Sequence, residues 1–237
     1  MDSEPYTAGG TALVTASATV ATVGGVPLRQ GDHVCAFYRG RAERDRLVTS
    51  FLAEGLRAEH VCTLLAAPED ARACRDALEA EVPTLVRAGG RLVVRDPQDT
   101  CLRNGVFDGD AMPASLRDWV AELLGGGGDG AADGGGRRRP RLLRIAVDMS
   151  WAHALVRPGF VRELVAYETR ATSWLRACPQ VGVCMYDLGL FGGDLIIPMV
   201  KAHPRVWLGG MVVENPYNLD QGLGPGTGAG PAGAVVN

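Results

Sequence analysis

"GDHVCAFY", residues 31–38, starts with a Gly-Asp pair that is typical of turns and continues as an almost unbroken apolar run. Successive side chains of a strand point to opposite faces, so His33 and Cys35 share one face, whereas Val34 and Tyr38 share the other. Apolar side chains on both faces are typical of a strand that helices cover on both sides. We therefore predict that this segment is a central strand of a parallel sheet.

Further apolar, β-branched segments follow along the chain, and segments with helical periodicity separate them. The expected strands are residues 61–66, 91–95, 142–148, 181–186 and 206–213. The expected helices are residues 43–57, 68–82, 113–124 and 158–177. This alternation predicts an α/β fold, a three-layer sandwich in which helices cover both faces of a mainly parallel sheet. In such sheets, ligands bind at the carboxyl ends of the strands.

Three segments are too rich in small residues, glycine or proline to offset the entropy of ordering their backbone. They are residues 1–24, the Gly-rich insertion 125–139 and the Gly/Pro tail 221–237. We predict that the two terminal segments are disordered and that the insertion is flexible. The folded domain is then expected to span residues 25–220.

Composition excludes several classes of protein. The formal net charge is −3, and the one basic tract, Arg137–Arg141, is interpreted as a solvated loop edge, so direct binding of nucleic acid is not expected. The cysteines lie far apart without a C-x-x-C pair, which argues against a disulfide framework and a zinc ribbon. The apolar run Thr11–Val23 is too short to span a membrane. We expect a cytoplasmic protein without membrane contact.

Two segments resemble the KaiC/RecA-type P-loop ATPase core. Residues 51–78, "FLAEGLRAEHVCTLLAAPEDARACRDAL", resemble its first helix, second strand and second helix, and residues 141–150, "RLLRIAVDMS", resemble its Walker B strand. The phosphate loop G-x-x-x-x-G-K-[ST] is missing, because residues 38–45, "YRGRAERD", contain one glycine and no lysine. The resemblance implies a RecA/KaiC-like fold with a degenerate P-loop region. ATP hydrolysis is not expected, and residual nucleotide binding in the crevice stays an alternative.

A second resemblance covers most of the predicted domain. The chain resembles the MEDS family, the sensory domain named from methanogens, methylotrophs and the regulator DcmR. The segments that carry the resemblance are "GDHVCAFY" (31–38), "FLAEGL" (51–56), "DMSWA" (148–152), "YE" (167–168), "CMYD" (184–187) and "AHPRVWLGGMVVENPYN" (202–218). The resemblance implies a non-catalytic sensor of small hydrocarbon-derived molecules in signal transduction or transcription control. Its expected partners are a small organic ligand, a regulatory protein such as an anti-sigma factor or transcription regulator, and a second copy of the chain.

The preferred ligand site combines aromatic and polar side chains near strand ends. Asp148, Ser150 and Trp151 follow the Walker B-like strand. In the resembled strand order, the strand that carries Tyr186 lies between the first strand and Asp148, so Tyr38 is expected to face the same pocket. Such a pocket would bind a polar head and stack an apolar body. The alternative is that Asp148 caps the next segment and Trp151 fills the sheet edge.

The pair His33 and Cys35 leaves two interpretations open. In the first, Cys35 is a core residue of the strand and His33, at the strand start, satisfies a loop carbonyl. In the second, the i, i+2 pair of imidazole and thiol converges on a polar ligand or a metal. Two donors do not make a metal site, so none is predicted without further ligands. The similar "HVC" at residues 60–62 is not expected to supply them, because two strands that are not neighbours lie more than about 10 Å apart.

Three more residues complete the candidates. Cys184 shares its strand with Tyr186, and Glu168 lies on the helix 160–175, where it faces either the pocket or solvent. His203 ends a helix, where the helix dipole favours a histidine without any ligand. The sequence identifies no cofactor.

Two functions follow from these features. The first is a sensor domain without catalytic activity, which acts through a partner protein. The second is a cysteine- or metal-dependent enzyme that uses His33 and Cys35, and it requires a base within reach of the thiol or a third metal ligand.

Overall fold

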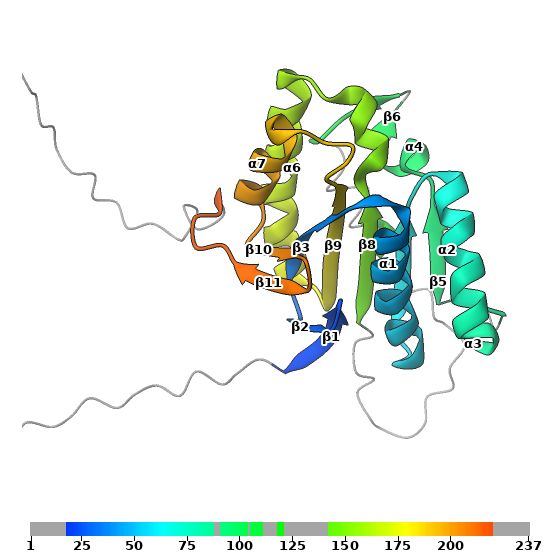
Figure 1. Cartoon of the computed structure of the whole chain (residues 1–237). Helices are drawn as coiled ribbons and strands as arrows, with labels where there is room; N and C mark the ends of the chain where they lie inside the picture. The colour runs from blue at the N-terminus through cyan, green and yellow to red at the C-terminus, as the bar shows by residue number, and fades with distance from the viewer. Residues whose placement is uncertain (1–17, 88–90, 104, 111–117, 121–141, 220–237) are drawn as a thin grey trace, which may run out of the picture.

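The computed structural model describes residues 18–87, 91–103, 105–110, 118–120 and 142–219. A seven-stranded sheet with the order β11-β10-β3-β9-β8-β4-β5 forms its centre (Figure 1). All neighbouring strands are parallel except the β10–β11 pair. The strands are β3 (His33–Tyr38), β4 (Val61–Leu65), β5 (Leu92–Arg95), β8 (Leu143–Asp148), β9 (Gln180–Asp187), β10 (Arg205–Leu208) and β11 (Met211–Glu214).

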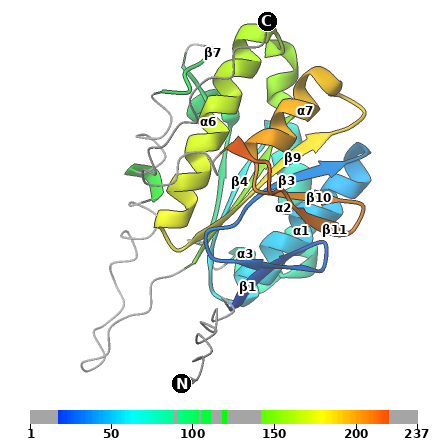
Figure 2. The ribbon, with the colours of Figure 1, turned by 90° about the vertical axis from the view of Figure 1, so that its left-hand side faces the viewer.

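Helices cover both faces of this sheet, as predicted (Figures 1 and 2). The first face carries α1 (Gly40–Arg57), α2 (Pro68–Glu81), α3 (Pro83–Arg87) and the hairpin β1 (Thr19–Val23) and β2 (Val26–Arg29). The second face carries α6 (Pro158–Ala177), α7 (Gly193–Ala202), the 3-10 helix η1 (Met149–Leu155), α4 (Pro97–Thr100) and the ribbon β6 (Leu102–Arg103) and β7 (Val106–Phe107). We call these the α1 face and the α6 face.

Strand β3 has the central position that its sequence predicts. All six of its residues are buried. Val34, Ala36 and Tyr38 pack in the apolar cluster of the α1 face, and Cys35 and Phe37 pack in that of the α6 face.

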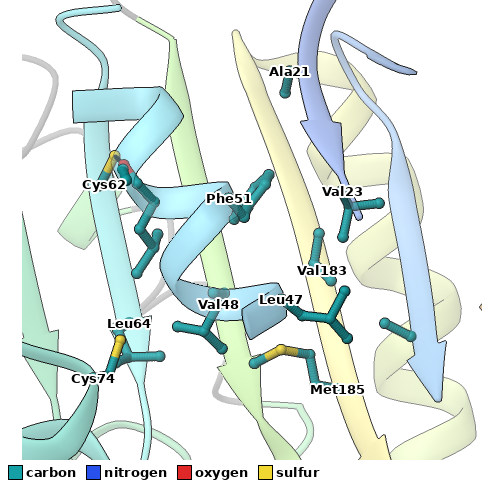
Figure 3. Close-up of a cluster of buried hydrophobic side chains, with 14 of the residues drawn as sticks. Ala21, Val23, Leu47, Val48, Phe51, Cys62, Leu64, Cys74, Val183 and Met185 are labelled. Carbon is teal, nitrogen blue, oxygen red and sulfur yellow. Dashed lines mark hydrogen bonds between the residues drawn. The ribbon is translucent and has the colours of Figure 1, made fainter. Parts of the chain in front are cut away.

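Helix α1 packs on its face through an apolar stripe. Leu47, Val48 and Phe51 point toward β9 and its neighbours (Figure 3). Phe51 and Leu52 are at most 2% exposed, and burying each such side chain contributes about 1.5–3 kcal/mol. Helix α2 begins at a proline whose missing N–H is not needed in the first turn.

The N-terminal boundary of the fold differs from the prediction. Residues 19–23, assigned above to a disordered segment, form β1 and pair with β2. Ala21 and Val23 are 1% exposed, and the backbone N–H of Thr22 donates to Glu54 of α1. Apolar and polar side chains partly alternate in "TVATV", as in a strand, but the Ala/Thr-rich composition of residues 1–24 predicts disorder. Residues 1–17, the insertion 125–139 and the tail 221–237 lie outside the described residues, as does most of the expected helix 113–124.

The expected strand 206–213 is also corrected, because it is a hairpin. Gly209 and Gly210 have φ values of 57° and 87°, which is the backbone of a tight two-residue turn between β10 and β11. The chain therefore reverses at the Gly-Gly pair and β11 forms the antiparallel edge of the sheet. Among the described residues, no helix has both the length and the apolar character needed to cross a membrane.

The charged side chain of Arg144 is buried in the α1 face. Arg144 of β8 is 1% exposed, and its guanidinium donates to Glu54 Oε2 (3.1 Å), His60 Nδ1 (3.1 Å) and the carbonyls of Phe51 (2.9 Å) and Val20 (3.2 Å). We call these groups the Arg144 network. Burial and the charge of Arg144 lower the pKa of His60, so its Nδ1 keeps the lone pair that accepts this bond.

Lowering the pH should therefore destabilise the protein partly through His60. Because the pKa of His60 is lower in the folded chain than its ordinary value of about 6.5, the unfolded chain binds more protons between these two values. The free energy of unfolding should fall as the pH drops from about 7 through this window. Urea denaturation at a series of pH values should show a smaller fall for His60→Gln than for the wild type, and equal falls would contradict the assignment.

Candidate functional site

The sheet separates the residues that were expected to share one pocket. Tyr38 and Asp148 lie on the α1 face, whereas Trp151 and Tyr186 lie in the apolar cluster of the α6 face. The reason is the register between β3 and β9, in which Tyr186 is level with Phe37. Side chains that are level on neighbouring strands point the same way, so Tyr186 cannot face Tyr38. The prediction of a single pocket was wrong.

On the α1 face, the carboxylate of Asp148 is engaged by the protein itself. Arg44 of α1 binds Asp148 Oδ2 at 3.1 Å and Asp70 Oδ1 at 2.9 Å. The hydroxyl of Tyr38 and the backbone N–H of Ser150 donate to Asp148 Oδ1 at 3.3 Å and 3.0 Å. Burial and the charge of Asp148 raise the pKa of Tyr38, which keeps its hydroxyl a donor. We call Arg44, Asp70, Asp148 and Tyr38 the Arg44 network, and the cavity beside it measures only about 10 Å³.

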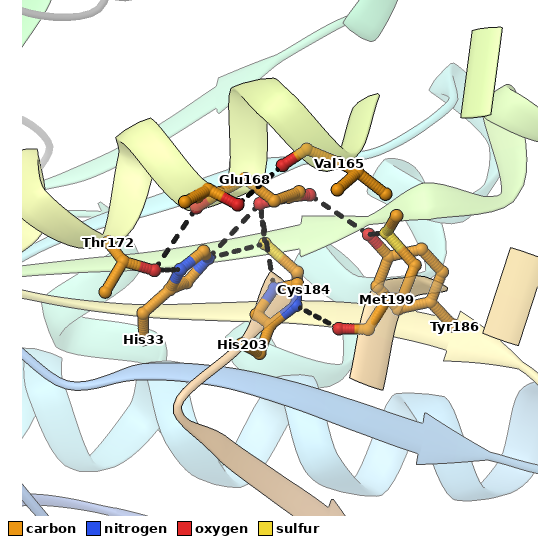
Figure 4. A network of polar contacts seen from close by, with 9 residues as sticks. His33, Val165, Glu168, Thr172, Cys184, Tyr186, Met199 and His203 are labelled. Atoms are coloured by element: carbon orange, nitrogen blue, oxygen red, sulfur yellow. Dashed lines mark hydrogen bonds and ion pairs between the residues drawn. The ribbon is translucent and has the colours of Figure 1, made fainter. Parts of the chain in front are cut away.

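On the α6 face, four side chains with metal-ligating atoms meet (Figure 4). They are His33 from β3, Glu168 from α6, Cys184 from β9 and His203 directly after α7, and we call them the four-donor cluster. All four are buried, and one donor atom from each lies within 4.8 Å of the others. Glu168 Oε2 is 3.3 Å from His33 Nε2, 3.6 Å from His203 Nε2 and 3.8 Å from Cys184 Sγ, and His33 Nε2 is 3.5 Å from Cys184 Sγ.

Hydrogen bonds orient both imidazole rings of the cluster. The hydroxyl of Thr172 donates to the carbonyl of Glu168 (3.2 Å), so its oxygen accepts from Nδ1–H of His33 at 2.8 Å. Nδ1–H of His203 donates to the carbonyl of Met199 at 2.8 Å. In both histidines, Nε2 therefore points to Glu168. The ring centroids lie 4.2 Å apart, and the ring planes are tilted by 46°.

The cluster is electrostatically unusual. Burial raises the pKa of Glu168, but hydrogen bonding and the charges of His33 and His203 lower it more, so the carboxylate is ionised. Burial and the charge of His33 lower the pKa of His203 to about 4, although the charge of Glu168 raises it. Burial and Glu168 raise the pKa of Cys184. Glu168 Oε1 accepts a hydrogen bond from Tyr186 at 3.0 Å.

A small cavity of about 50 Å³ adjoins the cluster beneath α6. His33, Glu168 and Cys184 form part of its wall, and the remainder is mainly apolar, with Trp151 and Trp174 among the lining residues. The indole N–H groups of both tryptophans have no hydrogen-bond partner among the described residues. The cavity lies between α6 and the sheet, and Leu65, Met149 and Trp151, at or just beyond the carboxyl ends of β4 and β8, also line it.

The structure thus brings four predicted residues together and adds one. His33, Cys184, Glu168 and Tyr186 meet as one group, and Cys35 is buried on the same face but is outside the four donors. His203, for which no ligand was expected, is the missed residue. It stands two residues before β10, and the register between β10 and β3 brings it close to His33. Strands β3 and β4 are separated by two strands, as predicted for the segment 60–62.

The fold and this site define a mainly parallel α/β domain with a buried polar centre. Residues 32–204 match the family model described as MEDS, the methanogen/methylotroph, DcmR sensory domain. The chain belongs to the MEDS family, which confirms the resemblance noted above and indicates a regulatory sensor role.

A curated protein and a solved structure are among the proteins that are similar to the chain. The transcriptional repressor DcmR of Methylorubrum extorquens is 25% identical over 182 residues, which are 76% of this chain and 61% of the repressor. The chain thus spans about three fifths of the length of this relative. An uncharacterized protein from Pyrococcus horikoshii, crystallised with an unknown peptide, has a TM-score of 0.53 at 11% identity, covering 76% of this chain and 77% of that one. This second likeness concerns the fold alone.

Proposed function

We propose that this protein is a non-catalytic sensor of small organic molecules in bacterial signal transduction or transcription control. The observation that carries the proposal is the cavity of about 50 Å³ between an apolar wall and the polar groups of His33, Glu168 and Cys184. One water molecule needs about 10–15 Å³ of such volume, so the space suits a molecule of only a few heavy atoms.

The lining of the cavity supports a ligand with two unlike ends. Its polar end would meet the ionised carboxylate of Glu168, and its apolar part would pack against Leu164 and Val147. The unpartnered indole N–H groups of Trp151 and Trp174 are further donors in the same wall. Few polar groups in a mainly apolar enclosure are typical of small-molecule sites.

The pKa directions of the thiols favour a sensor over a cysteine-dependent enzyme. A nucleophilic cysteine needs a thiolate, which a lowered pKa provides. Burial and the charge of Glu168 instead raise the pKa of both Cys35 and Cys184. We therefore keep the enzyme only as the alternative.

The α1 face supports a RecA/KaiC-like core without nucleotide binding. The strand order places β9 between β3 and β8, as the ATPase resemblance implies. The guanidinium of Arg44 occupies the crevice next to Asp148, where about 10 Å³ remain. A triphosphate does not fit there, and the degenerate loop offers no lysine.

Signalling is expected to pass through a partner protein in the cytoplasm. The family and the likeness to a repressor suggest regulatory partners, such as an anti-sigma factor or a transcription regulator, or self-association. The net charge of −3 does not favour direct contact with nucleic acid.

A thermal-shift experiment tests the proposed cavity. One- and two-carbon probes such as dichloromethane, methanol and ethanol should include one that raises the Tm by mass action, whereas cyclohexane and Mg-ATP should not. Ala171→Leu, which fills the cavity from α6, should abolish the shift.

The matched control is Ala166→Leu on the exposed side of the same helix, which should keep the shift. Absence of any shift from the small probes, or a shift that survives Ala171→Leu, would contradict the proposed ligand site.

A further inference from the structure

We infer that the four-donor cluster, His33, Glu168, Cys184 and His203, binds one divalent transition metal ion, with zinc as the best match. This inference goes beyond the proposed function, because metal binding at these side chains requires no organic ligand. It also differs from the metal hypothesis of the sequence, since Cys35 is not a donor.

The spacing of the donor atoms fits a tetrahedral ion. Zinc binds nitrogen and oxygen at about 2.0–2.2 Å and sulfur at about 2.3 Å, so tetrahedral ligand atoms lie about 3.3–3.6 Å from one another. The four donor separations given above run from 3.3 to 3.8 Å. The two nitrogen–oxygen separations, 3.3 and 3.6 Å, are longer than ordinary N–H···O hydrogen bonds of about 2.7–3.2 Å.

The hydrogen bonds of the two imidazole rings also leave a place for a cation among these atoms. Because Nδ1–H of His203 donates to the carbonyl of Met199, Nε2 is the ring atom that faces Glu168, at 3.6 Å from Oε2. This Nε2 is fully buried and has no hydrogen-bond partner among the described residues. A proton on Nε2 of His33 could be donated to the carboxylate of Glu168, but Nε2 of His203 would still have no partner. A metal ion that all four donors share resolves both contacts.

The surroundings of the cluster are those of a metal site. Histidine ligands usually donate their second ring N–H to an oxygen acceptor, as His33 does to Thr172 and His203 does to Met199. The carboxylate is held by Tyr186 at its other oxygen. These three contacts orient the donors before any ion binds.

The donor set selects the class of metal. Two imidazoles, a carboxylate and a thiol suit a borderline ion such as zinc, whereas Mg²⁺ and Ca²⁺ take oxygen ligands. Binding would displace the thiol proton of Cys184 to solvent and form a metal–thiolate bond. The double positive charge of the ion then balances the carboxylate and the thiolate, so the buried site becomes neutral, as an apolar interior requires.

Cobalt substitution tests the site in the intact 237-residue chain. After treatment with a chelator, Co²⁺ should bind with one ion per chain and give the strong visible bands of tetrahedral cobalt together with a thiolate-to-cobalt charge-transfer band. Zinc should displace it and raise the Tm of the wild type. Cys184→Ser should lose the charge-transfer band, whereas the matched control Cys35→Ser, also buried on the α6 face, should keep it.

A second variant distinguishes a specific loss of metal binding from a general loss of folding. Thr172→Val keeps the shape of its side chain but removes the acceptor for His33, and zinc affinity should fall about 10- to 100-fold. The inference is overturned if wild-type protein gives no tetrahedral cobalt spectrum, or if Cys35→Ser and Cys184→Ser lose the band equally. All of these readouts are taken without organic probes, so they succeed or fail independently of the proposed ligand.

Discussion

Arg144→Met should lower the free energy of unfolding by about 3–5 kcal/mol, the usual effect of removing one partner from a buried ionic network. Arg144 is 1% exposed and its guanidinium lies 5.3 Å from the centre of the Phe51 ring. Methionine fills a similar volume but leaves the carbonyls of Phe51 and Val20 without their donor. Chemical denaturation monitored by circular dichroism measures the change.

An exposed arginine provides the control for this substitution. Arg87 pairs with Glu79 at 2.9 Å, but its side chain is 72% exposed, so Arg87→Met should cost less than about 1 kcal/mol. Similar losses for the two variants would show that the Arg144 network does not stabilise the fold.

Arg44→Met is expected to have an effect of comparable size on the same face of the sheet. The side chain of Arg44 is 5% exposed, and its removal leaves the buried carboxylates of Asp148 and Asp70 without their shared cation. Burial lowers the pKa of Arg44, but hydrogen bonds with Asp45 and Asp70 and the charge of Asp148 raise it by more. The net pKa is therefore raised, and the guanidinium stays charged. A loss of about 3–5 kcal/mol in the free energy of unfolding is predicted.

Arg41→Met is the matched control, because Arg41 contacts the same Asp70 at 3.2 Å from a side chain that is 70% exposed. Its effect should be near the 0–1 kcal/mol typical of surface ion pairs. If both substitutions cost the same, Arg44 does not act as the cation of a buried network. If Arg44→Met gains affinity for Mg-ATP, the nucleotide-binding crevice is still present and the guanidinium of Arg44 blocks it in the wild type.

The alternation of residues 33–38 predicted which side chains of β3 share a face, and the structure follows it. The same reasoning failed for the pocket because it was not extended across neighbouring strands. The partner of Tyr38 in β9 is Asp187, so the faces of Tyr38 and Tyr186 are opposite. Which residues are level on two strands depends on the register, and a single sequence does not contain it.

Two other misses have different physical causes. Residues 19–23 belong to a segment rich in small residues, a composition that predicts disorder. The contacts of Ala21 and Val23 with the core stabilise them as a strand. The helix dipole alone explains a histidine such as His203 at the end of a helix, so nothing nearby in the sequence points to a ligand. Its neighbours in space, His33 and Glu168, are distant along the chain, and tertiary packing alone unites them.

The four donors come from separate elements of the chain, and this arrangement affects the degradation of the protein in a cell. Because they come from β3, α6, β9 and the end of α7, no proteolytic fragment that lacks one of these elements retains the full site. An occupied centre ties residue 33 to residue 203, and it favours the intact chain over any opened form by mass action. Proteases remove opened chains, so the abundance of the protein should follow the supply of whatever fills the centre.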